Sequence, residues 1–362
     1  MWIYEHPDWP HFTWDQAEIT PLLGAVRHRA GLLRGQIEAA PIDLHDNAHI
    51  DTLSHDVLAT SAIEGYQLDP GEVTSSVRSA LRGEQATAAR DVSGIVDIMV
   101  DATTNYSTPL TLERLFHWHT GLFGDTDDTI ALGRWRDDAT GPMRVISGPV
   151  GKYRIHFVAP PANTLPQGTN QFLDWFNQGA TSDPMISSGL AHFWFVTLHP
   201  FDDGNGRIAR AIGDMGLARA EHSPNRYYSV SSQILHDRAE YYRILESQQR
   251  GDLDLTPWLA WYLGCVGRSI DRAEETLGQV MFAKRVFDYL ARHPVSPRQH
   301  AIVSRMAHPD FVGHMNTSKY AKMARCSTDT ALRDIQQLVA KNILLPNDAG
   351  GRSTSYRLNT HR

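Results

Sequence analysis

Cysteine is scarce in this chain of 362 residues, which contains only two, Cys265 and Cys326. Two cysteines cannot form the disulfide framework that holds small secreted domains together, and they supply too few ligands for a zinc cluster. We therefore expect a reducing compartment. We also expect both cysteines to be small buried side chains.

Long apolar runs are also missing, since none approaches the ~20 residues that a helix needs to span a bilayer. The opening residues, Met1 to Pro7, lack a basic segment followed by an apolar core, so the sequence predicts no signal peptide. We expect a cytoplasmic protein with no membrane partner. Its 41% hydrophobic and 21% charged residues are ordinary for a globular chain, and the length allows two or three domains.

Charge is divided unevenly along the chain. Residues 281–362 contain 13 Lys and Arg against 5 Asp and Glu, a balance of +8, whereas the whole chain has 34 against 41, or −7. Residues 1–280 therefore carry −15. This asymmetry predicts a boundary near residue 280 and an anionic partner for the basic tail.

One stretch of twelve residues carries most of the chemistry. The segment before it, 187–198, has the apolar spacing of a buried helix, and a proline at position 200 places the histidine at position 199 at the exit of that helix. Glycines at positions 204 and 206, with an asparagine between them, allow positive φ, so successive amides can form an anion cradle where a second helix begins. The stretch consists of His199, Pro200, Phe201, Asp202, Asp203, Gly204, Asn205, Gly206, Arg207, Ile208, Ala209 and Arg210.

Two arginines and an acid complete the stretch. Arg207 and Arg210 are three residues apart on one helical face, where they can grip two phosphates. Asp203 offers the oxygen ligand that Mg²⁺ favours beside substrate phosphates. The combination suits a nucleoside triphosphate held next to a group that must lose a proton. A purely structural turn, and a metal hydrolase built on His192 and His199 without a third clear ligand, are the alternatives.

The stretch resembles the motif of the Fic family, His-Pro-Phe-x-(Asp/Glu)-Gly-Asn-Gly-Arg-x-x-Arg, at every defined position. Fic enzymes most often transfer AMP from ATP to a protein hydroxyl. The resemblance implies that His199 is the base for a Ser, Thr or Tyr hydroxyl and that Asp203 holds Mg²⁺ between the α- and β-phosphates. It implies that Arg207 neutralises the leaving pyrophosphate and that Arg210 binds the γ-phosphate. The implied phosphate cradle consists of Gly204, Asn205 and Gly206.

An upstream segment bears on control. The sequence predicts a helix over 51–64 that Gly65 ends, and a carboxylate in the last turn of a helix opposes the helix dipole, which suggests a partner elsewhere. A capping box at a helix start is the alternative. The residues from Thr60 to Gly65 resemble the Fic inhibitory motif, (Ser/Thr)-x-x-x-Glu-(Gly/Asn). The resemblance implies that Glu64 pairs with Arg210 and keeps ATP out of its productive pose.

Two further segments fit the family. β-Branched residues flank a Gly/Pro turn over 144–157 and predict a hairpin, which resembles the Fic flap that aligns a target side chain by strand pairing. An ordinary surface hairpin is the alternative. Three residues lie where family members contact adenine, although aromatic residues on a helix also serve as core. The flap residues are Val145, Ile146, Ser147 and Gly148, and the adenine contacts are Tyr241, Tyr242 and Gln249.

The basic tail resembles a winged helix-turn-helix. The sequence predicts a short helix over 317–324, a turn at 325–327 and an apolar-striped helix over 328–341. Strand-like segments follow at 343–346 and 353–358, and they resemble a β-wing.

Two uses of this tail stay open. In the DNA-binding interpretation, the helix over 328–341 enters a major groove, and Arg352 and Arg357 on the wing contact phosphates. In the other interpretation, the winged helix makes protein contacts or packs a dimer. Asp329 and Asp334, on the same helix, count against DNA.

The resemblance as a whole implies a mainly α-helical chain with a Fic-fold core, a small β-hairpin flap and a C-terminal winged helix. The expected domains are 1–105 with the inhibitory helix, 106–280 as the catalytic core, and 281–362. The expected activity is autoinhibited adenylylation with ATP and Mg²⁺ of an unknown target protein, including the chain itself in cis or trans, and a homodimer is an option. The competing functions are removal of AMP, transfer of UMP, phosphocholine or phosphate, and a nucleotide-sensing DNA-binding regulator.

Overall fold

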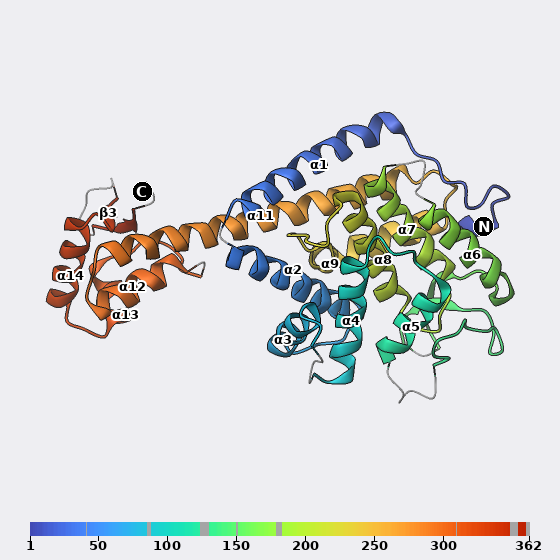
Figure 1. The fold of residues 1–362 in the computed structure, drawn as a ribbon, viewed down its shortest axis with the longest axis horizontal. Helices are drawn as coiled ribbons and strands as arrows, with labels where there is room; N and C mark the ends of the chain where they lie inside the picture. Colours follow the sequence, from blue (N-terminus) through green and yellow to red (C-terminus); the bar gives the residue numbers. More distant parts are fainter. Residues whose placement is uncertain are drawn as a thin grey trace. The chain divides into compact units, whose positions relative to one another are not determined.

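The computed structural model describes residues 1–40, 42–84, 88–123, 130–149, 151–178, 183–308, 310–347 and 354–359. These residues are mainly helical, as predicted, with two small antiparallel sheets (Figure 1). The chain divides into two compact units, Met1–Ala273 and Glu274–Arg362. The division falls within helix α11, Thr256–Arg292.

The first unit is a helical bundle with one β-hairpin. Short 3-10 helices lie at Ile3–Glu5 and Ala162–Thr164. The other elements are α1 (Gln16–Glu38), α2 (Ile42–Ile63), α3 (Pro70–Leu81), α4 (Arg90–Thr104), α5 (Leu112–Phe123), β1 (Arg144–Ser147), β2 (Arg154–Val158), α6 (Leu165–Asn177), α7 (Pro184–Leu198), α8 (Asn205–Glu221), α9 (Val230–His236), α10 (Arg238–Gln249) and the first part of α11.

Helices α7 and α8 form the centre of this unit, with α4 and α5 packed on α8 and α6 packed on α7 (Figure 1). Nearly every residue from Met185 to Leu198 is buried, because a helix that is apolar on all sides is stable only in an interior. The Asp183 side chain caps the first turn of α7. The two helices approach closely at Gly216, where an added Cβ would lie 2.8 Å from the Ser188 Cα.

A buried group of charges ties α2 to α8. Arg226 Nη2 donates to Asp56 Oδ2 at 2.6 Å, and Arg226 Nη1 lies 2.5 Å from Asp214 Oδ1. The three side chains are at most 4% exposed. Burial raises the pKa of Asp214, which the Arg226 cation opposes. Asp56 belongs to α2 and Asp214 to α8, so this contact holds the end of α2, and Glu64 just beyond it, against the central helices.

We expect Arg226→Met to lower the free energy of unfolding of the first unit by about 3–5 kcal/mol, because it leaves Asp56 and Asp214 buried without their cation. All nine tryptophans precede residue 273, so urea unfolding followed by tryptophan fluorescence measures this unit alone. Arg243→Met is the matched control, because Arg243 is an exposed arginine on α10. That variant should change stability by less than about 0.5 kcal/mol.

The deficit of Arg226→Met should also depend on pH. Burial raises the pKa of Asp214 above its unfolded value, so the destabilisation caused by losing Arg226 is full near neutrality and shrinks as the pH falls toward about 4. A deficit below about 1 kcal/mol, or one equal to that of the control, would show that the buried charges do not hold α2 in place.

The second unit contains the end of α11 and the elements that follow it. The helices predicted over 317–324 and 328–341 are present, and the strands near 343–346 and 353–358 pair antiparallel, although Arg352 lies outside the described residues. The winged-helix assignment itself stays a prediction. The elements are α12 (Pro297–Ala307), α13 (Thr317–Ala324), α14 (Thr328–Ala340), β3 (Leu344–Pro346) and β4 (Tyr356–Leu358).

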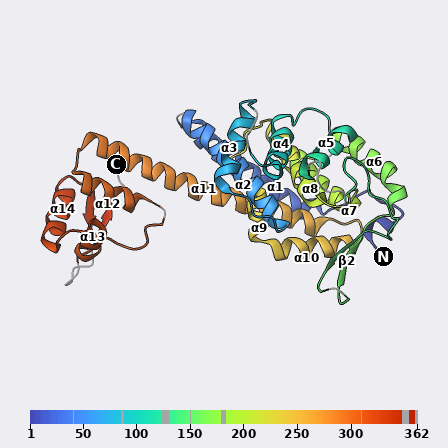
Figure 2. The ribbon, with the colours of Figure 1, turned by 90° about the horizontal axis from the view of Figure 1, so that it is seen from below.

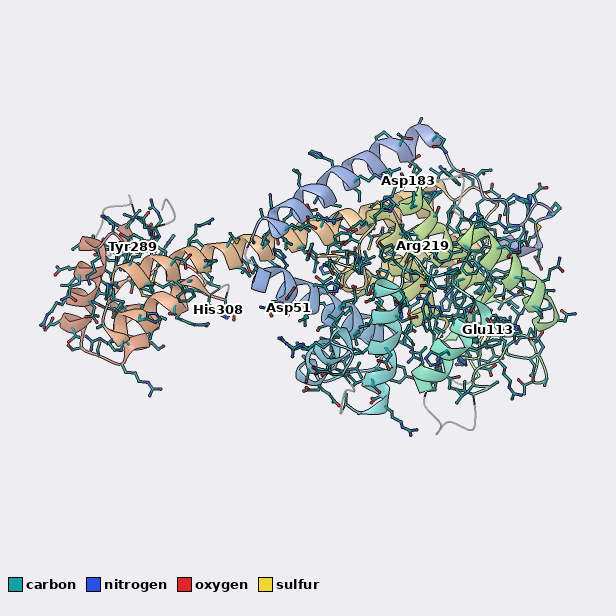
Figure 3. The ribbon with its side chains drawn as sticks, in the orientation of Figure 1. Asp51, Glu113, Asp183, Arg219, Tyr289 and His308 are labelled. Carbon is teal, nitrogen blue, oxygen red and sulfur yellow. The ribbon has the colours of Figure 1, made fainter. Side chains whose placement is uncertain are left out.

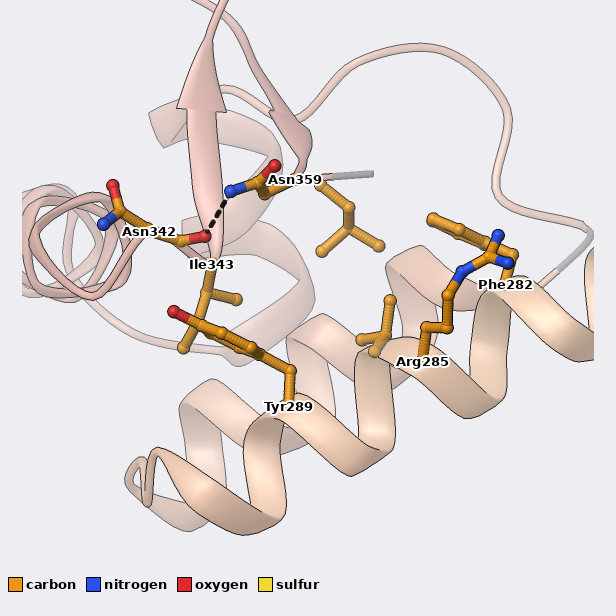
Figure 4. A pocket seen from close by; sticks show the side chains of 8 residues that line it. Phe282, Arg285, Tyr289, Asn342, Ile343 and Asn359 are labelled. Carbon is orange, nitrogen blue, oxygen red and sulfur yellow. Dashed lines mark hydrogen bonds between the residues drawn. The ribbon is translucent and has the colours of Figure 1, made fainter. Parts of the chain in front are cut away.

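A small cavity lies inside the second unit (Figure 4). The side chains of Phe282, Arg285 and Tyr289 line it from α11, and Ile343 lines it from the segment before β3. Its volume is ≈ 20 Å³, which is room for about one water molecule. The cavity is therefore a gap in packing and is too small for an organic ligand.

Two expectations from composition can be compared with the fold. In the described part of the chain, no helix combines the length and the apolar character needed to cross a membrane. Both cysteines are free, but only Cys265 is buried. Cys326 is partly exposed because it lies in the turn between α13 and α14, so the expectation of two buried cysteines was wrong for it.

Candidate active site

His199 directly follows the last residue of α7, at the helix exit, as predicted. Its backbone conformation is left-handed, with φ 48° and ψ 57°. Its Nδ1 is 3.2 Å from the Val196 carbonyl oxygen. A carbonyl oxygen only accepts, so Nδ1 carries the hydrogen and Nε2 keeps its lone pair. Burial, assisted by the Arg136 cation, lowers the pKa of His199 to about 4. The imidazole is therefore neutral near pH 7 and can accept a proton.

Arg136 holds the turn around His199. Its Nε donates to the His199 carbonyl at 2.7 Å and its Nη2 to the Pro160 carbonyl at 2.6 Å, while its backbone N–H donates to the Pro200 carbonyl at 3.0 Å. The Arg136 side chain is fully buried. These bonds hold His199 in its left-handed backbone conformation, which is uncommon for residues other than glycine. The sequence analysis missed it.

The loop between α7 and α8 is braced from inside. Phe201 is fully buried, and its ring stacks on His119 with 4.1 Å between the ring centroids. The Asn205 side chain closes the loop, since its Oδ1 accepts from the Phe201 N–H and its Nδ2 donates to the Phe201 carbonyl. The Asn205 side chain thus serves to hold the loop, and its backbone N–H belongs to the first turn of α8. His119 is a second residue that the sequence analysis missed.

The backbone of this loop differs from the prediction in one respect. Gly204 has positive φ, 80°, as expected, but α8 begins at Asn205, so Gly206 is helical. The other residue with a left-handed backbone in this segment is His199, which caps the C-terminal end of α7. Gly204 has no side chain to cap α8, so the first N–H groups of α8 point out of the helix unpaired within it. Such an end attracts anions.

Arg207 is a buried cation with unused donors. Its side chain is 8% exposed, and the guanidinium lies over the rings of Tyr66 and Phe123 at 5.0 and 4.9 Å. Its Nε and Nη2 have no hydrogen-bond partner among the described residues, and the nearest carboxylate oxygen, from Asp203, is 3.7 Å away. Buried donors of this kind need an acceptor. A phosphate oxygen is one that fits.

Arg210 is held by the end of α2. Its Nε donates to Thr60 Oγ1 at 2.6 Å, and its Nη2 donates to the Thr60 carbonyl at 3.1 Å and to Glu64 Oε1 at 2.7 Å. The Arg210 side chain is only 1% exposed, against 28% for Glu64. The structure therefore contains the ion pair that the resemblance implied. Arg210 Nη1 is buried without a partner among the described residues.

The Glu64 carboxylate also rests on the first turn of α8. A Cβ added at Gly206 would lie 2.2 Å from Glu64 Oε1, so glycine is needed here for close approach. Burial raises the pKa of Glu64, but the Arg210, Arg207 and Arg238 cations outweigh it and hold that pKa below its ordinary value. Glu64 thus places a carboxylate against Arg210 and a helix N-terminus, which is where a phosphate would be bound.

Asp203 lies on the open side of this loop. Its side chain is 52% exposed, and its Oδ1 accepts from the Gly204 N–H at 2.6 Å. Within the described residues there is no group of three or more His, Cys, Asp or Glu side chains that could hold a metal by themselves. One exposed carboxylate beside a phosphate site fits Mg²⁺, which keeps waters and takes its other ligands from the substrate.

The residues predicted to contact adenine lie on α10 beside this site. Tyr241 is 1% exposed, and its hydroxyl is 2.9 Å from His192 Nε2. Gln249 is also buried, and its Nε2 donates to Thr197 Oγ1 at 3.2 Å. Tyr242 is 39% exposed. In this conformation only Tyr242 offers much surface to a nucleotide, and the three contacts stay predictions.

The predicted hairpin is present as β1 and β2, with a bulge between Val145 and Ile146 (Figure 2). Gly148 has φ 102° and begins the turn. Ile146 is 52% exposed, which is high for a large apolar side chain. Ser147 Oγ is 2.6 Å from His156 Nε2 across the hairpin.

Helix α10 packs against β2 (Figure 2). Glu246 on α10 accepts from Arg154 Nη2 at 2.7 Å and pairs with His156 Nδ1 at 2.7 Å. Arg250 Nη2 donates to the carbonyls of Ile155 and His156, which covers the outer edge of β2. The residues of β1 are more exposed. A strand that adds to this hairpin therefore has the β1 edge available to it.

We expect Glu246→Ala to loosen the hairpin. Losing two charge-assisted contacts should raise amide hydrogen exchange over 144–158 by about tenfold, without changing exchange in α7. Glu240→Ala on the same helix is the control, because Glu240 pairs only with the exposed Arg243 among the described residues. Unchanged exchange in the hairpin of Glu246→Ala would show that α10 does not clamp it.

A larger hollow lies elsewhere in the first unit. Its lining includes Trp175, Phe176 and Arg219, and its volume is ≈ 380 Å³. Arg219 lies near the C-terminal end of α8 (Figure 3). The Arg219 guanidinium donates to the Tyr106 and Phe176 carbonyls. Among the described residues that line this hollow, none is a predicted site residue. It is separate from the chemistry at the other end of α8.

Comparison with known families supports the resemblance. Residues 109–217 match the Fic/DOC family, and this segment includes His199 to Arg210. The chain contains a Fic/DOC family domain. Residues 2–82, which include Thr60 and Glu64, match a domain of unknown function, DUF4172.

Several named relatives are similar to this Fic protein. Protein adenylyltransferase Fic of Nematostella vectensis is 34% identical over 222 residues, 59% of this chain and 46% of the relative. Protein adenylyltransferase Fic of Aedes aegypti is 27% identical over 231 residues, 62% of this chain and 41% of the relative. The chain thus spans less than half the length of each of these relatives.

Solved structures agree on the fold. A Fic family protein from Desulfovibrio desulfuricans G20 has a TM-score of 0.54 at 21% identity and covers 96% of this chain and 98% of its own. Fic-1 from C. elegans has a TM-score of 0.50 at 22% identity and covers 73% of this chain and 77% of its own. At these identities the likeness shows the fold alone.

Proposed function

We propose that this Fic protein is a protein adenylyltransferase that Glu64 holds in an inhibited state. The observation that carries the proposal is the pair of buried arginines at the N-terminus of α8. Arg207 has unused donors, and Arg210 donates to the carboxylate of Glu64, which directly follows α2. That carboxylate is itself an anion bound where phosphates would bind. The names of the relatives, which are protein adenylyltransferases, support the same activity.

The reaction follows from the positions of these groups. The hydroxyl oxygen of a target Ser, Thr or Tyr attacks the α-phosphorus of ATP, the bond from that phosphorus to the bridging oxygen breaks, and pyrophosphate leaves. His199 Nε2 accepts the hydroxyl proton, since Nδ1–H is turned to the Val196 carbonyl. The α8 amides, Arg207 and Arg210 stabilise the phosphate charges, which is the main work of such a site.

Asp203 is the residue that would hold Mg²⁺ in this proposal. When bound, the ion would supply positive charge that offsets the negative charge of the phosphates. Asp203 suits this role because its carboxylate is half exposed at the mouth of the loop and the Gly204 N–H fixes one of its oxygens. Arg207, 3.7 Å from the other oxygen, leaves that oxygen without a close ion pair.

Inhibition in this proposal is competition between anions. With Glu64 in place, Arg210 has two donors committed to Thr60 and Glu64, and the carboxylate occupies the space over Gly206. A γ-phosphate needs the same cation and the same space. Since the pKa of Glu64 is held below its ordinary value, the carboxylate stays charged at neutral pH and the inhibition does not relax there.

The site is also compatible with other outcomes. The same Glu64 can assist removal of AMP from a modified protein, and another donor, such as UTP, can replace ATP. Neither alternative is favoured by a particular contact. Both alternatives predict no covalent labelling of protein from ATP, whereas the proposal predicts labelling.

We expect Glu64→Gly to raise covalent labelling of protein from α-labelled ATP with Mg²⁺ by about 10- to 100-fold over wild type. The reason is that Arg210 and the first turn of α8 become free for phosphate. Adding His199→Ala to that variant should lower labelling by a factor of about 10² or more, because the base is lost. Incorporated label per protein at fixed time measures all three.

The control for Glu64→Gly is Glu240→Gly, an exposed acid on α10. If labelling rises equally in the control, the increase comes from a general loosening of the fold and not from the release of Arg210. Absence of label in wild type and in both Glu64 variants would refute ATP-dependent self-labelling, and a panel of other nucleotides would follow. Equal labelling with and without His199 would refute the role of the base.

A further inference from the structure

The charges of the second unit are arranged differently from what the sequence alone suggested. Asp334, which counted against DNA, is buried within the unit. Its Oδ2 accepts from Arg298 Nε at 2.6 Å and from the Tyr320 hydroxyl at 3.0 Å, and its Oδ1 accepts from Arg298 Nη2 at 3.1 Å. Its charge is therefore neutralised inside the helical core. It contributes nothing repulsive to the outer face of α14.

The connection between α13 and α14 is a tight turn. Arg325 ends α13 in the left-handed conformation, with φ 50°, and the Ser327 side chain caps α14 by accepting from the Thr330 N–H. Ala331, Ile335 and Leu338 bury one face of α14. The opposite face is left to solvent.

That outer face carries hydrogen-bond donors and positive charge. On α14 it includes Leu332, Arg333 and Gln336, all exposed. Lys322 on α13 and Arg325 in the turn are also exposed, and neither these two nor Arg333 has an ion pair with another described residue. Arginine and glutamine side chains are the ones that read guanine and adenine edges in a major groove.

The charge balance of this segment favours a polyanion. Residues 317–341 contain 5 Lys and Arg against 2 Asp, and one of the two acids, Asp334, is buried. The remaining acid, Asp329, lies in the first turn of α14, where its negative charge interacts favourably with the helix dipole. Residues 1–280, in contrast, carry −15. A basic helix pair on an acidic protein has charge complementarity with nucleic acid.

We infer that α13, the turn at 325–327 and α14 form a binding surface for double-stranded DNA. The outer face of α14 lies in the major groove, and Lys322 and Arg325 contact the phosphates that flank it. This activity is separate from adenylyl transfer and does not depend on it. Because much of the affinity comes from phosphates, binding weakens steeply as salt rises.

The test is fluorescence anisotropy of a labelled random-sequence duplex titrated with the full chain, from about 50 to about 200 mM salt. The disruptive variant is Lys322→Ala/Arg325→Asn/Arg333→Ala, in which asparagine keeps the left-handed turn at position 325. It should weaken binding at least tenfold and reduce the salt slope by about 2 to 3. Circular dichroism confirms that each variant is folded.

The matched control removes three exposed or partly exposed cations from the first unit, Arg78→Ala/Arg82→Ala/Arg243→Ala. It should bind the duplex as wild type does. The inference is overturned if wild type does not bind duplex at the lowest salt, or if the control variant loses as much affinity as the disruptive one. Self-association that the disruptive variant abolishes, without DNA binding, also overturns it and assigns the face to a second copy of the chain.

Discussion

A guanidinium buried at the N-terminus of a central helix must have an anionic or polar partner, and this requirement at Arg210 organises the first unit. Thr60 and Glu64 supply the partner from α2, and Gly206 leaves the space that the Glu64 carboxylate occupies. The buried Arg226 group then fixes α2 against α8. Removing any of these contacts leaves a buried charge uncompensated, which is costly. In the proposal above, the γ-phosphate of a nucleotide competes with Glu64 for this cation.

The position of His199 depends on a second group of contacts, which does not include Arg210 or Glu64. Arg136 binds the carbonyl of His199, and the stacked pair Phe201 and His119 anchors the loop that follows. The imidazole itself is oriented by the Val196 carbonyl, which faces Nδ1 and leaves Nε2 unprotonated. In the proposal, the base and the phosphate site thus lie at the junction of α7 and α8, while the inhibitory carboxylate follows a different helix, α2.

Much of this site could be predicted from the sequence because its residues are contiguous. The stretch from His199 to Arg210 places the base, the anion site and the cations by local geometry alone, and the hairpin has its own turn signal. Arg136, His119 and Arg226 could not be predicted, because a buried arginine or histidine looks the same in sequence as an exposed one. Asp334 was misjudged for the same reason: its partner, Arg298, is supplied by tertiary structure.

The most direct test of the central claim compares the binding of ATP and ADP by calorimetry. Two proteins that cannot turn over are needed, His199→Ala and Glu64→Gly/His199→Ala. If Glu64 occupies the γ-phosphate position, removing it should tighten ATP by about tenfold or more while ADP changes much less, because only ATP carries the phosphate that Arg210 awaits. Equal changes for ATP and ADP, or no change for either, would contradict the claim that Glu64 and the γ-phosphate compete for one cation.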